Sequence, residues 1–180
     1  MIAVASAQTY RLFTTENGLT SSLVNYIFED KYGLIWIATE DGLNKYDGVK
    51  ITSYKHKEGD ESSLASNYVS TIIEDAKGNL IVSTYKGLQI YRHDTDDFSP
   101  VGATPDGQLM KVNINRLMLE KDGRLYGTGD VSCEIRTKGK DKIEVLRMAK
   151  PYFSSQTTNE LDEKREAKIG RAVQQECRDR

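Results

Sequence analysis

The chain of 180 residues contains only two cysteines, two histidines, three prolines and one tryptophan. Its cysteines, Cys133 and Cys177, could form at most one disulfide with each other, and their spacing does not decide whether they pair. Its histidines, His56 and His93, support no catalytic triad, and we expect both in exposed loops or at strand ends. This scarcity also leaves no clustered Cys/His signature, so we predict no metal site and no cofactor.

The sequence also lacks a large excess of either charge, and it lacks long hydrophobic runs. The 25 Lys and Arg residues nearly balance the 27 Asp and Glu residues, which gives a net charge of -2. This balance leaves no electrostatic footprint for a nucleic acid or an anionic membrane. No run approaches the roughly 20 apolar residues of a transmembrane helix. We therefore expect no nucleic-acid partner and no membrane insertion by this chain.

The sequence does contain a repeat with a period of 45 residues. This shift carries Val24 to Val69 and Ile27 to Ile72, and it continues into a weaker third copy at Ile114. Further members are Asp30 and Asp75, Gly33 and Gly78, Gly42 and Gly87, Leu43 and Leu88, Tyr46 and Tyr91, and in the third copy Leu117, Gly123 and Leu125. We expect the register to hold without a gap, with Gly129 in place of the repeated threonine and Cys133 in place of the repeated leucine. Such a period indicates an array of supersecondary units.

Each unit predicts four short strands separated by turns. In the first copy these strands are LVNYIFED, LIWIAT, GLNKYDG and VKITSY, and the second is apolar enough to be buried on both faces. Gly33, Gly78 and Gly123 stand where a hairpin turn requires a positive φ. Four strands in about 45 residues are typical of a propeller blade. We therefore predict an all-β fold, a partial β-propeller of about three four-stranded antiparallel blades.

Three aromatic residues of the repeat are candidates for a function. Trp36, Tyr46 and Tyr91 either pack between adjacent blades or form an aromatic platform on which a sugar stacks. Both interpretations fit the sequence.

Acidic residues give no catalytic or metal site. The pairs Glu29-Asp30 and Glu74-Asp75 recur with the repeat, which indicates strand ends and turns and does not favour an acid and base around one substrate. The segment HDTDDF fails as an EF-hand loop because Ser99 and Pro105 occupy the positions that require glycine and a carboxylate. The sequence thus assigns no catalytic or metal-binding residue, and the ligand-binding residues stay unknown.

Two segments resemble the repeats of a known family. They are GLTSSLVNYIFEDKYGLIWIATEDGLNKYDGVKITSY and SSLASNYVSTIIEDAKGNLIVSTYKGLQIYRHDTDDF, which are similar to successive two-component regulator propeller repeats. The resemblance covers about residues 10–130, with mild departures at Thr20, Leu23 and Ile81. It implies that residues 10–13 supply the outer strand of the closing blade.

In that family the repeats build the periplasmic sensor region of Bacteroidetes hybrid two-component system sensor histidine kinases. The resemblance implies a fragment of a periplasmic, ligand-sensing propeller that responds to polysaccharide breakdown products. It implies no enzyme activity in this chain, because the kinase is a separate part of such proteins. The implied partners are an oligosaccharide in the complete sensor, and further blades or a second copy at exposed blade edges. Two alternatives stay open: a fragment of a propeller enzyme acting on polysaccharide, and a protein-interaction propeller.

The two ends of the chain depart from the repeat. Ala5 and Ala7 form the A-x-A arrangement of a signal-peptidase site, so residues 1–7 are expected to end an export signal, unless an alanine-rich segment merely begins the chain. Residues 8–150 are expected to form the partial propeller, with blades at about 20–64, 65–109 and 110–150. Residues 151–180 are expected to form a charged tail, helical or irregular, and Thr157 with Glu160 makes a capping-box pair there. Because closed propellers have about four to eight blades, we expect a piece of a larger sensor with an exposed blade face.

Overall fold

A computed structural model describes residues 12–147 of the chain. The expected export signal at residues 1–7, residues 10 and 11, the tail at 151–180 and Cys177 lie outside the described residues. Leu12 and Phe13 are described, and they belong to no strand. Within the described range, no helix has the length and hydrophobicity needed to cross a membrane.

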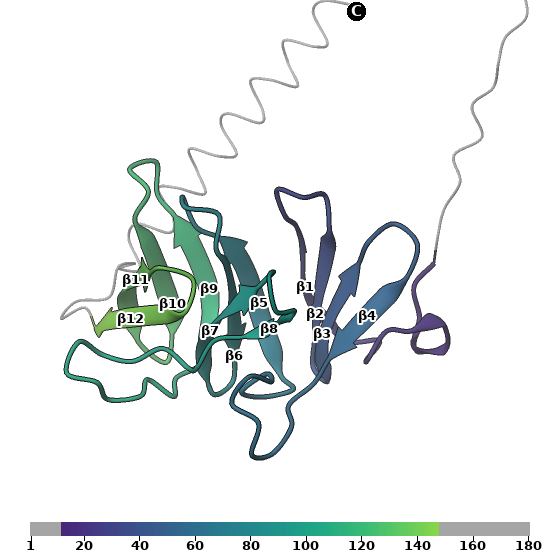
Figure 1. The fold of residues 1–180 in the computed structure, drawn as a ribbon, viewed down its shortest axis with the longest axis horizontal. Helices are drawn as coiled ribbons and strands as arrows, with labels where there is room; N and C mark the ends of the chain where they lie inside the picture. Colours follow the sequence, from purple (N-terminus) through teal and green to yellow (C-terminus); the bar gives the residue numbers. More distant parts are fainter. Residues whose placement is uncertain (1–11, 148–180) are drawn as a thin grey trace, which may run out of the picture.

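The described chain folds into three four-stranded antiparallel sheets, each a simple meander (Figure 1). Blade 1 comprises β1 (Val24–Glu29), β2 (Ile35–Thr39), β3 (Gly42–Tyr46) and β4 (Ile51–Tyr54). Blade 2 comprises β5 (Val69–Glu74), β6 (Leu80–Thr84), β7 (Gly87–Arg92) and β8 (Asp97–Phe98). Blade 3 comprises β9 (Ile114–Leu119), β10 (Leu125–Gly129), β11 (Ser132–Lys138) and β12 (Lys142–Arg147). The predicted all-β partial propeller of about three blades is confirmed; a short 3-10 turn, η1 (Thr15–Asn17), precedes the first blade.

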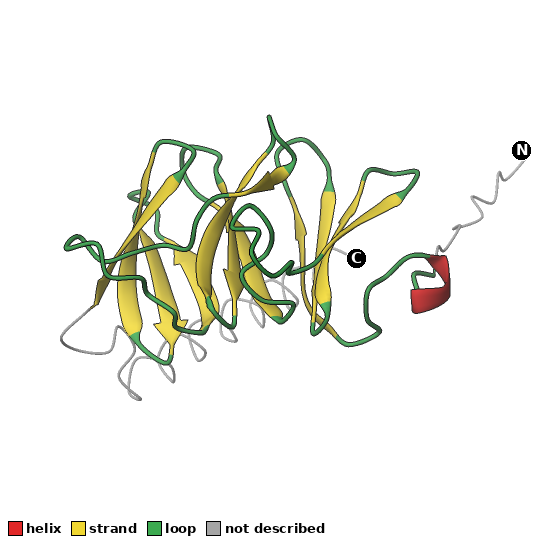
Figure 2. Cartoon of the chain, turned by 60° about the horizontal axis from the view of Figure 1, so that its bottom comes forward, coloured by secondary structure: helices red, strands yellow, loops and turns green. Residues whose placement is uncertain are grey.

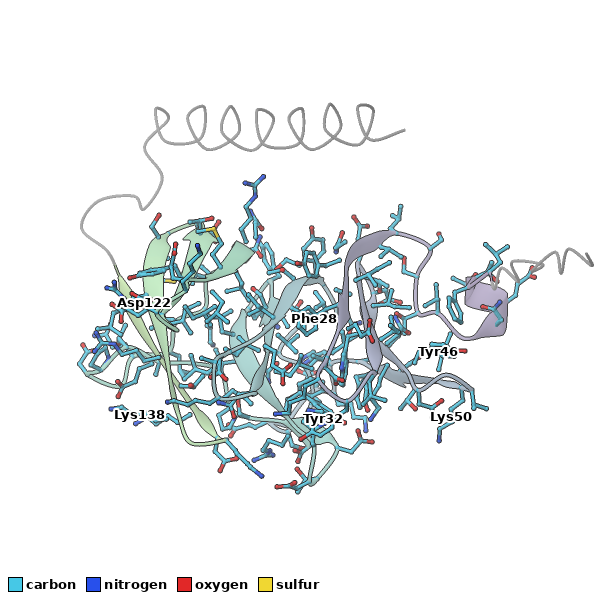
Figure 3. The ribbon with its side chains drawn as sticks, turned by 90° about the horizontal axis from the view of Figure 1, so that it is seen from above. Phe28, Tyr32, Tyr46, Lys50, Asp122 and Lys138 are labelled. Carbon is cyan, nitrogen blue, oxygen red and sulfur yellow. The ribbon has the colours of Figure 1, made fainter. Side chains whose placement is uncertain are left out.

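The blades stand in chain order, and their first strands are neighbours in space. Strand β1 packs against β5, and β5 packs against β9, although the two strands of each pair begin 45 residues apart in the sequence. Figure 2 shows the same row of three sheets from another direction. Side chains fill the spaces between the sheets in Figure 3, where Tyr46 and Lys50 mark the blade 1 end and Asp122 and Lys138 the blade 3 end.

The first strands of blades 1 and 2 each contain a bulge whose extra residue reaches the next blade. The pairing register shifts around Asn25 in β1 and around Ser70 in β5. Asn25 Nδ2 donates to the carbonyl of Val69 at 2.8 Å, and Ser70 Oγ donates to the carbonyl of Ile114 at 2.8 Å. A bulge frees a side chain that a regular ladder would point elsewhere. The repeated bulge therefore supplies a polar link between consecutive blades at one fixed register.

The repeated aspartate organises the first hairpin of blades 1 and 2. Asp30 Oδ1 accepts the backbone N–H groups of Tyr32 at 2.9 Å and Leu34 at 3.0 Å, and Oδ2 accepts Trp36 Nε1–H at 2.8 Å. Asp75 accepts the corresponding two backbone bonds, from Lys77 and Asn79. These carboxylates are occupied by turn formation, as the sequence indicated. The turn glycine Gly33 has a φ of 76°, and the equivalent Gly78 and Gly123 also have positive φ angles. The prediction for these hairpin turns is therefore confirmed.

Two apolar cores lie between the blades. The first joins blade 1 to blade 2 and includes Trp36, Ala38, Leu43, Leu64, Val69, Ile72, Leu80, Val82, Tyr91 and Phe98. The second joins blade 2 to blade 3 and includes Ile81, Leu88, Ile90, Ile114, Leu125, Cys133, Ile135, Ile143 and Val145. Both faces of blade 2 are therefore covered, which explains why β6 is buried along its whole length.

Blade 1 leaves its other face open. Ile27 is 61% exposed, whereas its repeat equivalent Ile72 is 1% exposed. Val24 is likewise 43% exposed, and its equivalent Val69 is fully buried. The same residue type at the same strand position thus changes from surface to core when a preceding blade covers it. The expected exposed blade face is present at this end of the described chain.

The third copy departs from the predicted register by one residue. In blades 1 and 2, Ile37 pairs with Asn44 and Val82 with Gln89, whereas in blade 3 Gly127 pairs with Cys133. The turn between β10 and β11 is therefore one residue shorter than its two counterparts. Cys133 takes the place of Asn44 and Gln89 instead of the leucine, so the expectation of an ungapped register is wrong beyond Gly129. Side chains alternate between the two faces of a strand. After this one-residue deletion, each residue of β11 therefore points to the opposite face from the residues 45 and 90 positions earlier.

Candidate functional site

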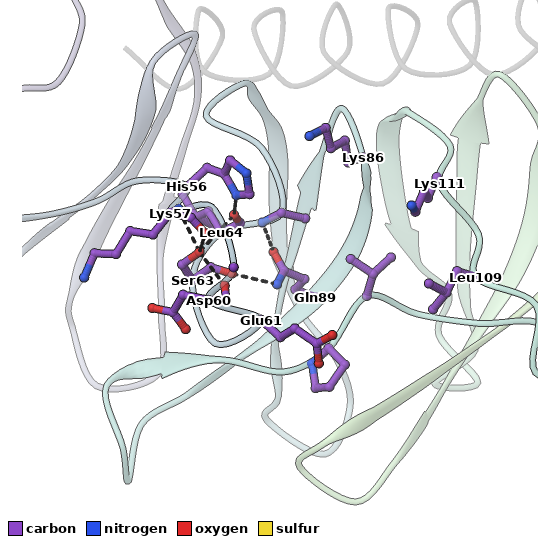
Figure 4. A pocket seen from close by; sticks show the side chains of 14 residues that line it. His56, Lys57, Asp60, Glu61, Ser63, Leu64, Lys86, Gln89, Leu109 and Lys111 are labelled. Carbon is purple, nitrogen blue, oxygen red and sulfur yellow. Dashed lines mark hydrogen bonds between the residues drawn. The ribbon is translucent and has the colours of Figure 1, made fainter.

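A cavity of about 430 Å³ opens beside blade 2, at the end of the molecule where the chain passes from one blade to the next (Figure 4). Its walls come from the β4–β5 connection, the β8–β9 connection and the β6–β7 turn. Lys57, Lys86, Lys111, Asp60 and Glu61 supply charge. Its apolar lining consists of Leu64, Ala65, Pro100, Val101 and Leu109. Such a mixture of apolar surface and a few polar groups is typical of a small-ligand site.

Gln89 on β7 holds the two connections in place. Its Nε2 donates to the carbonyls of Ser63 at 3.0 Å and Ser99 at 2.9 Å, and its Oε1 accepts the N–H of Ala65 at 2.7 Å. Gln89 is 1% exposed, so these bonds are shielded from water. Breaking them would leave buried polar groups unpaired, which is costly. The wall of the cavity is therefore anchored to the blade.

The β4–β5 connection is further organised by its own side chains. Ser63 Oγ accepts the N–H of Lys57 at 2.9 Å and donates to the carbonyl of Asp60 at 2.8 Å. Hydrogen bonds from the hydroxyl and backbone N–H of Ser62 lower the pKa of Asp60, which is therefore ionised at neutral pH. His56 Nδ1 lies 2.6 Å from the carbonyl of Leu64. Because a carbonyl only accepts, Nδ1 carries the proton and the other ring nitrogen of neutral His56 is an acceptor.

The cavity holds no catalytic constellation. None of its residues is paired as nucleophile and base. In the part of the chain that the structure describes, no group of three or more His, Cys, Asp or Glu side chains could hold a metal ion.

The aromatic residues singled out in the sequence have divided roles. Trp36 and Tyr91 lie in the core between blades 1 and 2, with ring centroids 4.6 Å apart. Tyr46 lies outside both cores and packs edge-on against Phe13, with centroids 4.8 Å apart. Packing between blades therefore accounts for Trp36 and Tyr91 and does not account for Tyr46.

A half-buried lysine, Lys45, occupies the space beside these rings. Lys45 Nζ lies 5.7, 5.3 and 5.2 Å from the ring centroids of Trp36, Tyr54 and Tyr91. It also contacts Asp96 Oδ1 at 2.6 Å, and the hydroxyls of Tyr54 and Tyr91 donate to the same oxygen. Burial raises the pKa of Asp96, but the bonds from Lys45 and the two tyrosines outweigh it and hold the pKa at about 2. The rings thus enclose the protein's own cation, which leaves no open stacking platform there.

The two histidines lie in different settings. His56 is exposed in the β4–β5 connection, as predicted. His93 is half-buried directly after the end of β7, with Tyr32 and Tyr91 each 4.8 Å away between ring centroids, so it lies at a strand end, which is one of the two predicted settings. Desolvation lowers the pKa of His93, which favours the neutral ring.

A second cavity of about 320 Å³ lies between blades 2 and 3 and is lined by charges of both signs. Asp75, in its wall, is occupied by turn bonds and by Thr137 Oγ1 at 2.6 Å. Lys77 Nζ donates to the carbonyl of Thr137 at 2.9 Å. These groups form hydrogen bonds that join blade 2 to blade 3, and their polar atoms already have partners within the protein.

The family model described as two component regulator propeller matches residues 18–41 and 63–86. The chain carries two-component regulator propeller repeats. The two matches begin in successive copies of the 45-residue period, and each runs from the segment before a first strand to the β2–β3 or β6–β7 turn. The lining residues Ser63, Leu64, Ala65 and Lys86 of the larger cavity fall within the second repeat.

Individual proteins resemble the chain over limited stretches. A curated relative, "Histidine kinase P4" of Formosa agariphila, is 39% identical over 56 residues, which is 31% of this chain and 4% of the relative. Among solved structures, an extracellular domain assigned to a hybrid two component system of B. thetaiotaomicron is 20% identical with a TM-score of 0.42, and covers 76% of this chain and 26% of its own. A second such domain from that organism is 18% identical with a TM-score of 0.37, and covers 80% and 26%. This chain therefore spans a small part of each protein that it matches.

Of the cavity residues, sequence reasoning named only His56, and it gave this histidine no role in binding. The signal for them was nevertheless present, because Lys86 stands 45 residues after Asp41, and the same turn position thus changes its charge between copies. A binding site in a repeat protein is expected where one copy departs from the others.

Proposed function

We propose that this chain is part of the periplasmic ligand-sensing propeller of a two-component signal-transduction protein, and that the protein responds to polysaccharide breakdown products. The observation that carries the proposal is the pair of two-component regulator propeller repeats, which fold into neighbouring blades. The local identity to a protein named as a histidine kinase supports it. In this proposal the chain contributes recognition, and phosphotransfer occurs elsewhere in the protein.

The cavity beside blade 2 offers a physical route from binding to signalling. Its walls belong to the connections that enter and leave blade 2, so one ligand would contact the chain on both sides of that blade. A ligand shifts a conformational equilibrium only by its difference in affinity for the two states. A ligand that fits the cavity in one arrangement of the blades would therefore favour that arrangement. Gln89 would transmit this preference because it anchors both connections to β7.

The test is saccharide-dependent phosphorylation of the protein that contains this chain, in membranes of its native cells. Membranes would be incubated with ATP and with enzymatic digests of individual polysaccharides, and phosphohistidine would be measured on the immunoprecipitated protein. We expect one digest to change the phosphohistidine level severalfold while the undigested polymers do not. Absence of phosphohistidine under every condition would refute the proposal. Breakdown of a purified polysaccharide by the chain itself would instead support a propeller enzyme.

A further inference from the structure

We propose that the 430 Å³ cavity binds an acidic sugar, one that carries a carboxylate or a sulfate ester, and that Lys86 and Lys111 contact the anionic group. The proposal rests on the proposed sensing function and names the class of its ligand. It is carried by a change of charge at one position of the repeat, by cations without ion-pair partners, and by the arrangement of the remaining cavity wall.

The turn that carries Lys86 is acidic in both neighbouring blades. In blade 1 the corresponding Asp41 pairs with Lys55 at 2.6 Å and accepts Asn67 Nδ2–H at 3.0 Å. In blade 3 the turn residue Asp130 accepts the N–H of Asn113 at 3.0 Å. Asp41 ties the blade 1 turn to the connection that leads into the first strand of blade 2, whereas Asp130 bonds to the segment before the first strand of its own blade. The contact that Asp41 makes to the following connection is the one that a lysine at position 86 cannot repeat.

In blade 2 the same contact has no means of forming. Lys86 replaces the aspartate, and Val112 stands 45 residues after Asn67. The side-chain bridge that Asp41 makes in blade 1 is consequently not repeated in blade 2, and Lys86 and the β8–β9 connection line the same cavity. The position at which the second copy differs in charge from the first thus lies in the wall of the cavity.

Two lysines of the cavity, Lys86 and Lys111, form no ion pair with the described part of the chain. Several other described cations do pair with carboxylates, for example Lys138 with Glu144 at 2.5 Å and Arg92 with Asp97 at 2.7 Å. Within residues 12–147, no carboxylate lies within 4 Å of the ammonium group of Lys86 or Lys111. Cations gathered in a concave site raise the local concentration of anions. These two lysines come from different connecting segments and share one cavity (Figure 4).

The rest of the wall suits a sugar ring and its hydroxyls. Leu64, Val101 and Leu109 offer apolar surface to the C–H face of a ring. The acceptor nitrogen of neutral His56 and the carboxylate of Glu61 can accept hydroxyl protons. Figure 4 shows Lys86 and Lys111 on one side of the lining residues and Lys57 and Asp60 on the other, so the side with Lys86 and Lys111 is cationic and the other side carries both charges. A ligand with an anionic group at one end and hydroxyls at the other matches this arrangement.

The test is a titration of the purified chain at low ionic strength, followed by isothermal calorimetry and ligand-observed NMR. The charged probes are digalacturonate, an alginate disaccharide and galactose 6-sulfate, which separate carboxylate from sulfate recognition. The neutral probe is galactobiose, which matches digalacturonate except for its carboxylates, and inorganic sulfate is the non-sugar anion. The variants are Lys86→Gln and Lys111→Gln. Lys121→Gln is the matched control, because Lys121 is an exposed lysine outside the cavity lining.

We expect at least one charged sugar to bind more tightly than galactobiose and inorganic sulfate. Each cavity variant should weaken that binding by about fivefold, the factor for losing one solvent-exposed ion pair of about 1 kcal/mol. The Lys121→Gln variant should bind as the parent chain does. Equal binding of galactobiose or of inorganic sulfate, an equal loss in Lys121→Gln, or no binding of any charged sugar would overturn the inference. The phosphorylation test is independent of these outcomes, so failure here would leave the sensing function to be judged by its own experiment.

Discussion

At the residue scale, the cluster around Lys45 explains why the aromatic residues of the repeat do not form a sugar platform. Trp36, Tyr54 and Tyr91 surround an ammonium group that the chain supplies itself. Asp96 completes the cluster from the β7–β8 turn, with a φ of 57°. Asparagine and aspartate tolerate this left-handed conformation better than most residues do. The cluster joins β3 of blade 1 to the outer hairpin of blade 2, so its role is to hold two blades together.

The first prediction concerns Asp96→Asn, which keeps the shape and the backbone preference but removes the charge. Because the folded pKa of about 2 lies below the unfolded value of about 3.9, the carboxylate stabilises the fold above the unfolded pKa. That stabilisation is lost as the pH falls through the folded pKa. We expect the variant to lose about 1 kcal/mol near pH 7, since the group is partly exposed. The difference from the parent should vanish near pH 2.

Urea unfolding followed by the fluorescence of Trp36, the single tryptophan, measures this difference at each pH. Asp94→Asn is the control, because Asp94 pairs with Lys140 on the surface outside the cluster. A loss of stability that is the same at pH 7 and pH 2 would contradict the account of Asp96.

The second prediction concerns Cys133. Burial raises the pKa of its thiol to about 11. The thiol is fully buried, so reagents cannot reach it, and its raised pKa keeps it out of the reactive thiolate form. In a Cys177→Ser chain we expect no labelling by a maleimide under native conditions and complete labelling in urea. The Cys133→Ser chain serves as the control for the other thiol, and rapid native labelling of Cys133 would disprove its burial.

At the element scale, the blade interface is built from repeated positions whose surroundings differ. Ile27 and Ile72 are the same residue in the same strand position, and only Ile72 is covered by a preceding blade. A truncation that removes identical atoms from both therefore measures the contribution of the neighbouring blade.

The third prediction is that Ile72→Ala lowers the free energy of unfolding by about 2 to 5 kcal/mol, while Ile27→Ala lowers it by less than about 1 kcal/mol. The first substitution leaves a cavity between blades 1 and 2, and the second removes atoms that water already reaches. Urea titrations of the two variants and the parent give the comparison. Equal losses would show that the face of blade 1 is covered in solution.

Elements governed by local sequence were predictable, whereas a one-residue deletion and the cavity between connecting segments were not. The strands and hairpin turns follow from alternation, from turn glycines such as Gly33 and from the repeated aspartate. The shorter turn before Cys133 escaped prediction because the 45-residue alignment of Ile114 and Leu125 continued past a deletion that only strand pairing reveals. The cavity was missed because its walls come from two connections and a turn that are far apart in the sequence and that only the fold brings together.

At the scale of the whole molecule, the two end faces of the described blades differ in chemistry. The open face of blade 1 carries the exposed apolar side chains of Val24 and Ile27. On blade 3, Tyr126 pairs with Glu134, where the two earlier blades have Trp36 opposite Lys45 and Ile81 opposite Ile90. The outward face of blade 3 is thus more polar than the corresponding face of blade 2. We therefore expect the open face of blade 1 to be covered by a blade with an apolar surface like that of blade 2.

The measurement that tests the central claim most directly is the sequence of the complete reading frame that contains this chain. The account predicts further propeller repeats in frame, a membrane span and histidine kinase domains. It also predicts a blade with apolar residues at the positions of Ile81, Leu88 and Ile90, suited to cover Val24 and Ile27. A complete frame that encodes neither a membrane span nor a kinase would contradict the claim that this propeller belongs to a two-component sensor.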